Sequence, residues 1–248
     1  MMGEQTTDRT VLKISGADAE KFLQDMVTND VTKGGLIYAA LLTPQGKYLF
    51  DFFLLKQDAH WVLDIKAERA SALAQRLAMY RLRADVAISE SDLPVQRGLG
   101  QMPEGAFPDP RHAALGWRLY GGNVGGVSTI DWDAIRVEHC IPETGVELIS
   151  GESYILEAGF ERLNGVDFKK GCYVGQEISA RMKHKTELRK GLATVAVTGV
   201  APVGTEITAM GKAAGVLYTQ AGGKAIAYLR FDRAKGQMQA ADATVSVL

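Results

Sequence analysis

KKGCYVGQE, residues 169–177, is the stretch of this chain that carries the most chemistry. Cys172 follows two lysines and lies between Gly171 and Gly175. The two lysines and the start of a helix predicted over about residues 176–182 would both stabilise a thiolate, and such settings lower a cysteine pKa from about 8.5 to roughly 3.5–7.5. The glycines permit unusual backbone angles and the close approach of a ligand or partner. A buried, inert cysteine in a tight turn is the alternative, and the residues alone leave both open.

A run of basic residues follows this stretch. RMKHK, residues 181–185, together with Arg189 and Lys190 places five Lys or Arg side chains within ten residues, relieved only by Glu187. A polycarboxylate tail or a phosphate group would suit such a run. A solvated connection between two elements is the more common use of a charge run, and it stays open as the alternative.

Three carboxylates occur in apolar or turn-like surroundings. Asp51 lies within LFDFFLL, residues 49–55, and on an alternating strand it would face the core or a pocket together with Phe53. Glu157 lies in ILEAG, and Glu143 lies in IPETG. A buried carboxylate is costly unless it is paired or used. Each of the three is therefore a candidate site residue, with a salt bridge, a backbone cap or a plain turn as the alternative.

The order of the predicted elements indicates an α+β fold. Strand-like runs are found at residues 10–15, 38–42, 47–55, 60–65 and 85–89. An amphipathic helix is predicted over residues 67–82, and shorter helices over residues 129–139 and 153–158.

The second half of the chain differs in texture. Prolines and glycines gather between about residues 94 and 127, which predicts a long surface connection that marks an internal boundary or an excursion. After residue 189, short β-rich runs alternate with Gly-rich or polar turns, as is typical of a small antiparallel β-barrel. The predicted domains are a two-part region over residues 1–188 and a C-terminal barrel over residues 189–248.

The composition is that of a soluble globular protein, with 46% hydrophobic and 23% charged residues and a formal net charge of −1 over 248 residues. These values exclude a disordered or fibrous chain and argue against non-specific nucleic-acid binding. No apolar run approaches the roughly 18 residues needed to cross a bilayer, and no secretory or transit-peptide pattern opens the chain. Two cysteines are too few for a disulfide framework, so we expect a cytoplasmic protein.

Familiar metal and nucleotide motifs are missing. The sequence has no Walker A, HExxH or CxxC pattern, and its four histidines are scattered. A single cysteine in a signature cannot hold an iron–sulfur cluster, which usually needs about four ligands. We therefore expect no permanently bound metal.

The residues around Cys172 resemble a known family. KGCYVGQE at residues 170–177, followed by Ala180-Arg181 and Arg189-Lys190, is similar to the signature of the YgfZ folate-binding proteins, whose mitochondrial members are iron–sulfur cluster assembly factors. Further matches run along nearly the whole chain: Phe22-Leu-Gln24, Thr28-Asn-Asp30, Leu42–Lys47 with Asp51, Asp109-Pro-Arg111 with Gly116 and Arg118, Ile141-Pro-Glu143 and Leu156–Gly159. The wider superfamily includes the glycine-cleavage T-protein, a tetrahydrofolate-dependent aminomethyltransferase.

The resemblance implies three subdomains in a ring around a central folate channel, the barrel being the last. It also implies that tetrahydrofolate or another reduced folate is bound there. By position, Glu143 matches the acid that holds the pterin in the T-protein. Asp51 matches one member of an acidic pair beside the folate nitrogens, with Phe50 standing where the other acid would be.

Two departures separate this chain from the T-protein. Ile155 stands where the T-protein has an arginine, so Arg162 or Arg181 would have to supply that cation to the folate. The T-protein also lacks the Lys-Gly-Cys signature that this chain has. Both differences favour an accessory factor over aminomethyl transfer.

The first functional hypothesis is a folate-binding accessory factor for the assembly or repair of iron–sulfur proteins. Asp51, Glu143 and Glu157 would bind the folate. Cys172 would carry a transient adduct or contact an iron–sulfur carrier or client protein, with Lys170 keeping it ionised. The remaining residues of the motif are Gly171, Tyr173, Gly175, Gln176 and Glu177.

The alternative is a one-carbon transferase similar to the T-protein. Asp51 would then orient the folate and assist the attack of its nitrogen on a methylene group. Whether the protein is an enzyme is left open by the residues. A nucleic-acid modifier using the basic run is the weakest alternative, because the net charge is −1 and no other basic cluster occurs.

Overall fold

The structure is a computed structural model that describes residues 2–122, 126, 129–184 and 187–248. The chain forms two compact units. The first comprises Met1–Ile130 and Glu161–Gln176, and the second comprises Asp131–Phe160 and Glu177–Leu248. Lys185 of the basic run lies outside the described residues, as does part of the glycine-rich end of the 94–127 region.

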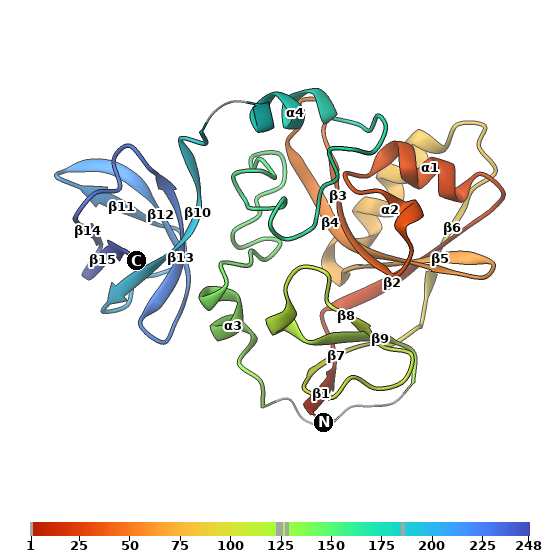
Figure 1. The fold of residues 1–248 in the computed structure, drawn as a ribbon, viewed down its shortest axis with the longest axis horizontal. Helices are drawn as coiled ribbons and strands as arrows, with labels where there is room; N and C mark the ends of the chain where they lie inside the picture. The colour runs from red at the N-terminus through yellow and green to blue at the C-terminus, as the bar shows by residue number, and fades with distance from the viewer. Residues whose placement is uncertain (1, 123–125, 127–128, 185–186) are drawn as a thin grey trace. The chain divides into compact units, whose positions relative to one another are not determined.

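A five-stranded antiparallel sheet forms the centre of the first unit (Figure 1). Its strands, in spatial order, are β3 Leu36–Leu42, β4 Tyr48–Gln57, β5 His60–Lys66, β2 Arg9–Ser15 and β6 Ala87–Ser91. Helices α1, Ala19–Met26, and α2, Ala67–Arg81, pack against one face of this sheet. The sequence predicted these strands and α2, because alternating and 3.6-residue apolar patterns are local signals.

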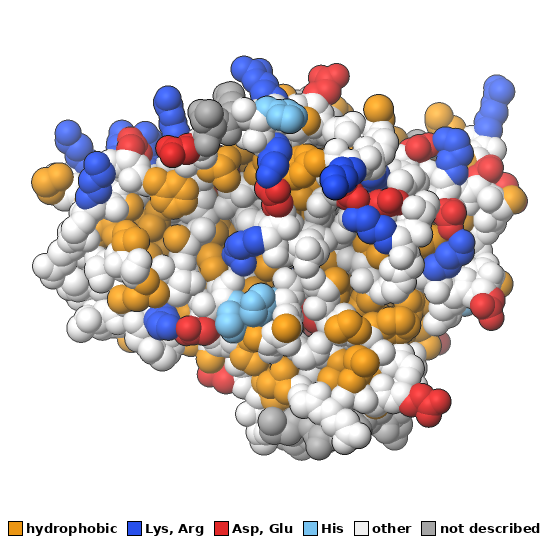
Figure 2. Space-filling view, in the orientation of Figure 1, with side chains coloured by type: hydrophobic (Ala, Val, Ile, Leu, Met, Phe, Trp, Pro, Cys, Tyr) orange, Lys and Arg blue, Asp and Glu red, His pale blue; other side chains and the backbone are white. Residues whose placement is uncertain are grey.

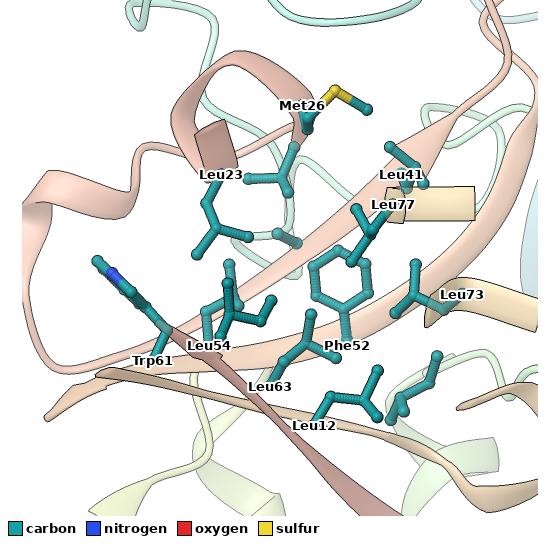
Figure 3. Packing of buried hydrophobic residues seen from close by; sticks show 14 of the residues in the cluster. Leu12, Leu23, Met26, Leu41, Phe52, Leu54, Trp61, Leu63, Leu73 and Leu77 are labelled. Carbon is teal, nitrogen blue, oxygen red and sulfur yellow. The ribbon is translucent and has the colours of Figure 1, made fainter. Parts of the chain in front are cut away.

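The core of the first unit lies between this sheet and the two helices. Figure 3 shows Leu23 of α1 and Leu77 of α2 on the side of the sheet that carries Phe52, Leu54 and Leu63. All five side chains are fully buried. Full burial of one such side chain stabilises a fold by about 1.5–3 kcal/mol, so this layer fixes the position of α1 on the sheet.

The proline-rich region contributes three strands to a second, four-stranded sheet rather than forming a surface connection. The four strands of this sheet, in spatial order, are β1 Met2–Gln5, β7 Val95–Leu99, β9 Trp117–Tyr120 and β8 Phe107–Pro108. Pro108 is tolerated because β8 is an edge strand, where no ladder N–H is required on the outer side. The prolines thus mark turns and one edge within the unit.

The second unit contains a closed six-stranded antiparallel barrel, as the sequence predicted. Its strands are β10 Lys190–Thr198, β11 Thr205–Ala209, β12 Lys212–Ala221, β13 Lys224–Arg230, β14 Gln237–Ala240 and β15 Ala243–Val247. The sequence did not predict strand β14, because its outward residues are glutamines and only Met238 and Ala240 point into the barrel core. The α+β class is confirmed.

The segment before the barrel belongs to the same unit. Helix α3, Trp132–Glu138, lies within the predicted range. No helix forms over residues 153–158, where the chain makes turns that continue through Gly159, with φ of +79°, to residue 164. Helix α4, Gln176–His184, follows the Lys-Gly-Cys stretch.

The molecular surface carries charges of both signs. On the face drawn in Figure 2, Lys and Arg side chains lie interspersed with Asp and Glu side chains. Among the helices that the structure describes, none is long and apolar enough to cross a membrane.

Candidate functional site

The segment that leads into the Lys-Gly-Cys stretch is fastened to the first unit by Thr28 and Asn29. The Thr28 hydroxyl donates to the Gly165 carbonyl at 2.6 Å, and the Asp167 amide donates to the Thr28 carbonyl at 3.0 Å. The Asn29 side-chain amide donates to the carbonyls of Asn164 at 2.7 Å and of Tyr38 at 2.9 Å. Both anchoring side chains are buried, so the segment is held by hydrogen bonds shielded from water.

Lys170 supplies the next anchor. Its ammonium donates to the carbonyls of Gln24 at 2.7 Å, Val27 at 2.6 Å and Asn29 at 3.0 Å. The Gln24 and Val27 oxygens lie at the C-terminal end of α1, where the helix dipole favours a cation, and the Asn29 oxygen lies just after the helix. Burial lowers the pKa of Lys170 to about 8, although nearby aspartates act to raise it. The sequence interpretation has Lys170 keep Cys172 ionised, whereas the structure binds its three N–H groups to α1 and the residues just after it.

Cys172 lies on the exposed side of this anchored loop. Its neighbour Gly171 is also exposed and has open space where a Cβ would be. Tyr173 is buried, with its ring 5.3 Å from the Lys170 ammonium. The alternative of a cysteine sealed in the core therefore does not match the structure, and the thiol is accessible to a partner.

Gly175 packs the loop against the turn between β3 and β4. Its φ is +82°, and a Cβ at this position would lie 2.5 Å from the Thr43 carbonyl oxygen and 3.1 Å from the Gly46 Cα. Both the backbone angle and the close approach require glycine. The chain then enters α4 at Gln176, whose amide donates to the Tyr173 carbonyl at 3.2 Å.

The predicted cations are exposed and belong to different units. Arg162 is an exposed turn residue of the first unit. Arg181 is exposed in the last turn of α4, with Lys183 and His184, in the part assigned to the second unit. Glu177 is exposed in the first turn of α4, where a carboxylate favours the helix dipole.

Asp51 lies on the face of the large sheet opposite α1 and α2. Its carboxylate accepts hydrogen bonds from the hydroxyls of Tyr38 at 2.9 Å and Tyr48 at 2.7 Å. Burial and the Asp51 charge raise the pKa of Tyr38 well above its ordinary value. Asp51 is thus a buried, oriented carboxylate, and it shares its side of β4 with Phe53 as strand alternation predicts.

A buried ionic network on the same side of the large sheet as Asp51 has no predicted role. Asp64 of β5 accepts from Arg9 at 2.6 Å and from Arg118 of β9 at 3.0 Å, and Asp109 pairs with Arg111 at 2.8 Å. The three guanidinium groups lie 3.9–5.5 Å from the Phe53 ring centre. Asp64 gives the same signal as Asp51, a carboxylate inside an apolar strand, so this pattern could have found it.

In the second unit, Glu143 belongs to a cluster around Glu147. The Glu143 amide donates to the Glu147 carboxylate at 2.8 Å, and Arg136 binds Glu147 at 2.6 Å. Arg136 also lies 3.8 Å from the Glu143 carboxylate, whose side chain stays 24% exposed. Glu147 itself is buried and accepts from the Thr219 hydroxyl at 2.5 Å. The sequence did not predict a role for Glu147, because its partners come from three separate segments.

Glu157 is the other predicted carboxylate of the second unit. It is half-buried and accepts a hydrogen bond from the Tyr228 hydroxyl at 2.7 Å. The structure therefore places Asp51 in one unit and Glu143 and Glu157 in the other. Within the described part of the chain, no group of three His, Cys, Asp or Glu side chains is arranged to hold a metal ion.

Known proteins resemble this chain over most of its length. The profile of the CAF17 C-terminal beta-barrel domain matches residues 189–248. The human mitochondrial iron–sulfur cluster assembly factor IBA57 is 30% identical over an alignment that covers 93% of this chain and 78% of the human protein. The chain belongs to the IBA57 family. Mouse IBA57 is 29% identical with the same coverage, and the Neurospora crassa homologue is 29% identical over 74% of this chain and 51% of its own length.

The names of these IBA57 relatives correct one expectation. All three are mitochondrial proteins by name, so the expectation of a cytoplasmic protein is wrong. The cysteine count misled because it distinguishes a reducing from an oxidising environment and cannot separate two reducing compartments.

The fold of this IBA57 family member matches that of a T-protein. The glycine cleavage system aminomethyltransferase T from Bartonella henselae superposes with a TM-score of 0.75, covering 99% of this chain and 84% of that protein. The two are 14% identical, so the likeness concerns the fold alone.

Proposed function

We propose that this IBA57 family member assists the assembly or repair of iron–sulfur clusters, binds a reduced folate, and presents Cys172 to iron–sulfur carrier or client proteins. The observation that carries the proposal is an exposed Cys172 on a loop fastened by Thr28, Lys170 and Gly175. A fixed, accessible thiol suits brief contact with a partner, because little conformational entropy is lost when the partner binds.

The cluster is cargo in this proposal. Iron–sulfur clusters usually need about four thiolate-type ligands, and the Lys-Gly-Cys loop offers one. A partner would supply the others, so the protein purified alone is expected to contain no stoichiometric iron or sulfide. Colorimetric iron and sulfide assays check this, and a stoichiometric cluster on the isolated chain would contradict it.

Asp51, Glu143 and Glu157 are each proposed to contact the folate. The two tyrosines orient the Asp51 carboxylate, and the Glu143 side chain keeps a quarter of its surface exposed. Ionised carboxylates are acceptors that match the N–H groups of a pterin edge. A bound reduced folate supplies one-carbon chemistry at its nitrogen atoms. The exposed Arg162 and Arg181 have the charge that a glutamate tail requires.

A titration of the full chain with tetrahydrofolate tests the folate part of the proposal. We expect saturable binding that Asp51→Asn and Glu143→Gln each weaken at least about tenfold, equivalent to about 1.4 kcal/mol. Glu138→Gln, at an exposed glutamate of the same unit as Glu143, is the matched control and should bind normally. Absence of saturable binding by the wild type would remove folate from the proposal.

Substitution of each cysteine in turn tests the role of the loop. Cys172→Ser should abolish support of iron–sulfur enzyme activity in a cell that lacks its own factor and leave folate binding unchanged. Cys140→Ser, at the half-buried cysteine of the second unit, should retain support. The opposite pattern, with a mild Cys172 variant, turnover of an aminomethyl donor and its loss in Asp51→Asn, would favour a one-carbon transferase instead.

A further inference from the structure

A groove of about 370 Å³ lies beside helix α1 in the first unit. Its floor comes from the buried side chains of Phe22 and Met26, and its other wall comes from Tyr80 of α2 and from Ala84, shortly after that helix. All four side chains belong to, or pack against, the core between the helices and the large sheet. Figure 3 shows Met26 at the edge of this core, on the side away from the sheet. The groove is therefore a place where the core of the first unit reaches the surface.

The side chains of the groove are of the kinds that protein interfaces favour. Methionine and aromatic residues are enriched at interfaces, and a thioether chain adapts to differently shaped partners. Tyr80 is half-buried, and its hydroxyl has no hydrogen-bond partner among the described residues. A tyrosine with an apolar ring and an unused hydroxyl suits a contact that is dry on one side and wet on the other.

Two carboxylates line the groove along α1. Asp18 and Asp25 are seven residues apart, which is two helical turns and roughly 10 Å along the helix axis. Lys21 lies between them and pairs with Asp25 at 2.6 Å. Asp18 accepts a hydrogen bond from the Asp85 amide at 2.8 Å and forms no salt bridge within the described part of the chain. Two carboxylates thus share one lysine, so the rim of the groove favours a cationic partner.

Helix α1 also carries the attachment of the Cys172 loop. The Lys170 ammonium donates to the carbonyls of Gln24 and Val27, and the charge of Asp25 acts on it. The groove and the loop belong to the same compact unit. A segment seated in the groove would therefore lie beside the end of α1 to which the loop is fastened.

We propose that this groove docks a basic amphipathic helix of a partner protein. Apolar side chains spaced three and four residues apart lie along one face of such a helix and would fill the groove. Lys or Arg side chains two turns apart would meet Asp18 and Asp25. Pockets of about 300–1,000 Å³ hold groups larger than a single ion, so the groove has room for neighbouring side chains. Folate and Cys172 take no part in this docking, which goes beyond the proposed function.

Three peptides of about 16 residues, long enough to form a helix, test the proposal. The first carries Leu along one helical face with Lys on both flanks and Ala elsewhere. The second has Glu in place of Lys, and the third has the composition of the first in an order that removes the apolar stripe. Each would be titrated into the full chain, labelled with ¹³C at its methionine methyl groups and followed by NMR. The Met26 signal is assigned by its loss in Met26→Leu.

We expect a saturable shift of the Met26 signal with the first peptide and at least about tenfold weaker binding of the other two. Binding of either of those peptides as tightly as the first, or no saturable shift of Met26, would overturn the proposal. This comparison is made on the wild-type chain, so it does not depend on how any groove variant folds.

Matched charge variants then locate the site. Asp25→Lys should weaken the Lys peptide at least about tenfold and strengthen the Glu peptide, because the rim of the groove becomes positive. Asp92→Lys, at an exposed aspartate of the same unit outside the groove, should leave both affinities unchanged. The gain for the Glu peptide shows that Asp25→Lys is folded. An unchanged affinity of Asp25→Lys for the Lys peptide, or an equal loss in both variants, would overturn the proposal.

Analytical ultracentrifugation of the chain alone separates a partner's helix from a second copy of this chain. A monomer that binds the Lys peptide supports the docking of a partner. A dimer that the Lys peptide dissociates, and that Asp25→Lys also disrupts, would identify a second copy as the occupant and overturn the proposal.

Discussion

Asp64 and Lys170 are both buried charges of the first unit, but they are compensated in different ways. Asp64 is bound by two full positive charges, Arg9 at 2.6 Å and Arg118 at 3.0 Å, and by the Tyr120 hydroxyl at 2.9 Å. Lys170 is bound by three main-chain carbonyls at 2.6–3.0 Å, which are dipoles. Dipoles replace lost hydration less completely than opposite charges do, so the pKa of Lys170 falls to about 8.

The two buried charges have different roles in the unit. Asp64 joins β5 of the large sheet to β9 of the small sheet. Its ion pairs with Arg9 and Arg118 hold the two sheets together. Lys170 joins the Cys172 loop to α1 by hydrogen bonds from an ammonium group whose pKa is lowered to about 8. The architecture therefore depends on paired charges, whereas the candidate site depends on an anchor that responds to pH.

The largest expected effect comes from breaking the paired charge. Asp64→Asn leaves Arg9 and Arg118 without their carboxylate and should lower the free energy of unfolding by about 3–5 kcal/mol in urea denaturation. Asp25→Asn, which breaks an exposed pair with Lys21, should cause no measurable change. A destabilisation in Asp64→Asn no larger than that of the control would show that the network contributes nothing to stability.

Removal of the Lys170 anchor should have a smaller effect. Lys170→Met leaves three carbonyls without their donor and should lower the free energy of unfolding by about 1–3 kcal/mol. In a Cys140→Ser background, alkylation of Cys172 by iodoacetamide should also change several-fold, because the loop loses its attachment to α1. Lys169→Met, at the exposed neighbouring lysine, is the control. Equal alkylation rates in the two lysine variants would contradict the anchoring role.

Two glycines of the same motif should differ in their tolerance of a side chain. Gly175→Ala should destabilise the protein by about 1–2 kcal/mol, since its φ of +82° and the nearby Thr43 carbonyl disfavour a side chain. Gly171→Ala has open space and should change stability by less than about 0.5 kcal/mol. Thermal unfolding of both variants checks the prediction, and similar losses at the two positions would refute it.

The smallest expected effect is a pH dependence. Lys170 titrates at about 8 in the folded protein and at its ordinary value of 10.5 when unfolded. Between these values the unfolded chain holds more protons than the folded one, so the contribution of Lys170 to stability rises with pH across this window and is flat below it. Urea unfolding at about pH 7 and about pH 9 should therefore show a rise in the wild type that Lys170→Met lacks. An identical pH dependence of the two proteins would disprove the assignment.

Much of the fold could be predicted from local patterns. The strands of the large sheet, α2 and the barrel follow from alternating or helical spacing of apolar residues. The turns at residues 153–158 were mistaken for a helix, because their sequence has helical propensity and the competing contacts come from distant segments. The proline-rich region was mistaken for a surface connection, since strands as short as β8 leave too few residues for a periodic signal.

The candidate site was predicted only in part. The Lys-Gly-Cys stretch and Asp51 stood out as unusual residues in their local surroundings. Asp64 gives the same local signal as Asp51 and was overlooked, whereas Glu147 gives no such signal, although both are buried and paired. Their arginine and threonine partners lie up to 72 residues away along the chain, and no local pattern reports such pairs.

The amino-acid sequence by itself determined the YgfZ-like signature around Cys172 and the sheet and barrel patterns, because these depend on neighbouring residues. The exposure of Cys172 came from the structure. Only the tertiary structure decided what Lys170 does. Its three acceptors lie 141–146 residues earlier in the chain, and a main-chain carbonyl has no sequence signature of its own. The buried ammonium finds them because folding brings the end of α1 beside the loop, where water no longer competes for its protons.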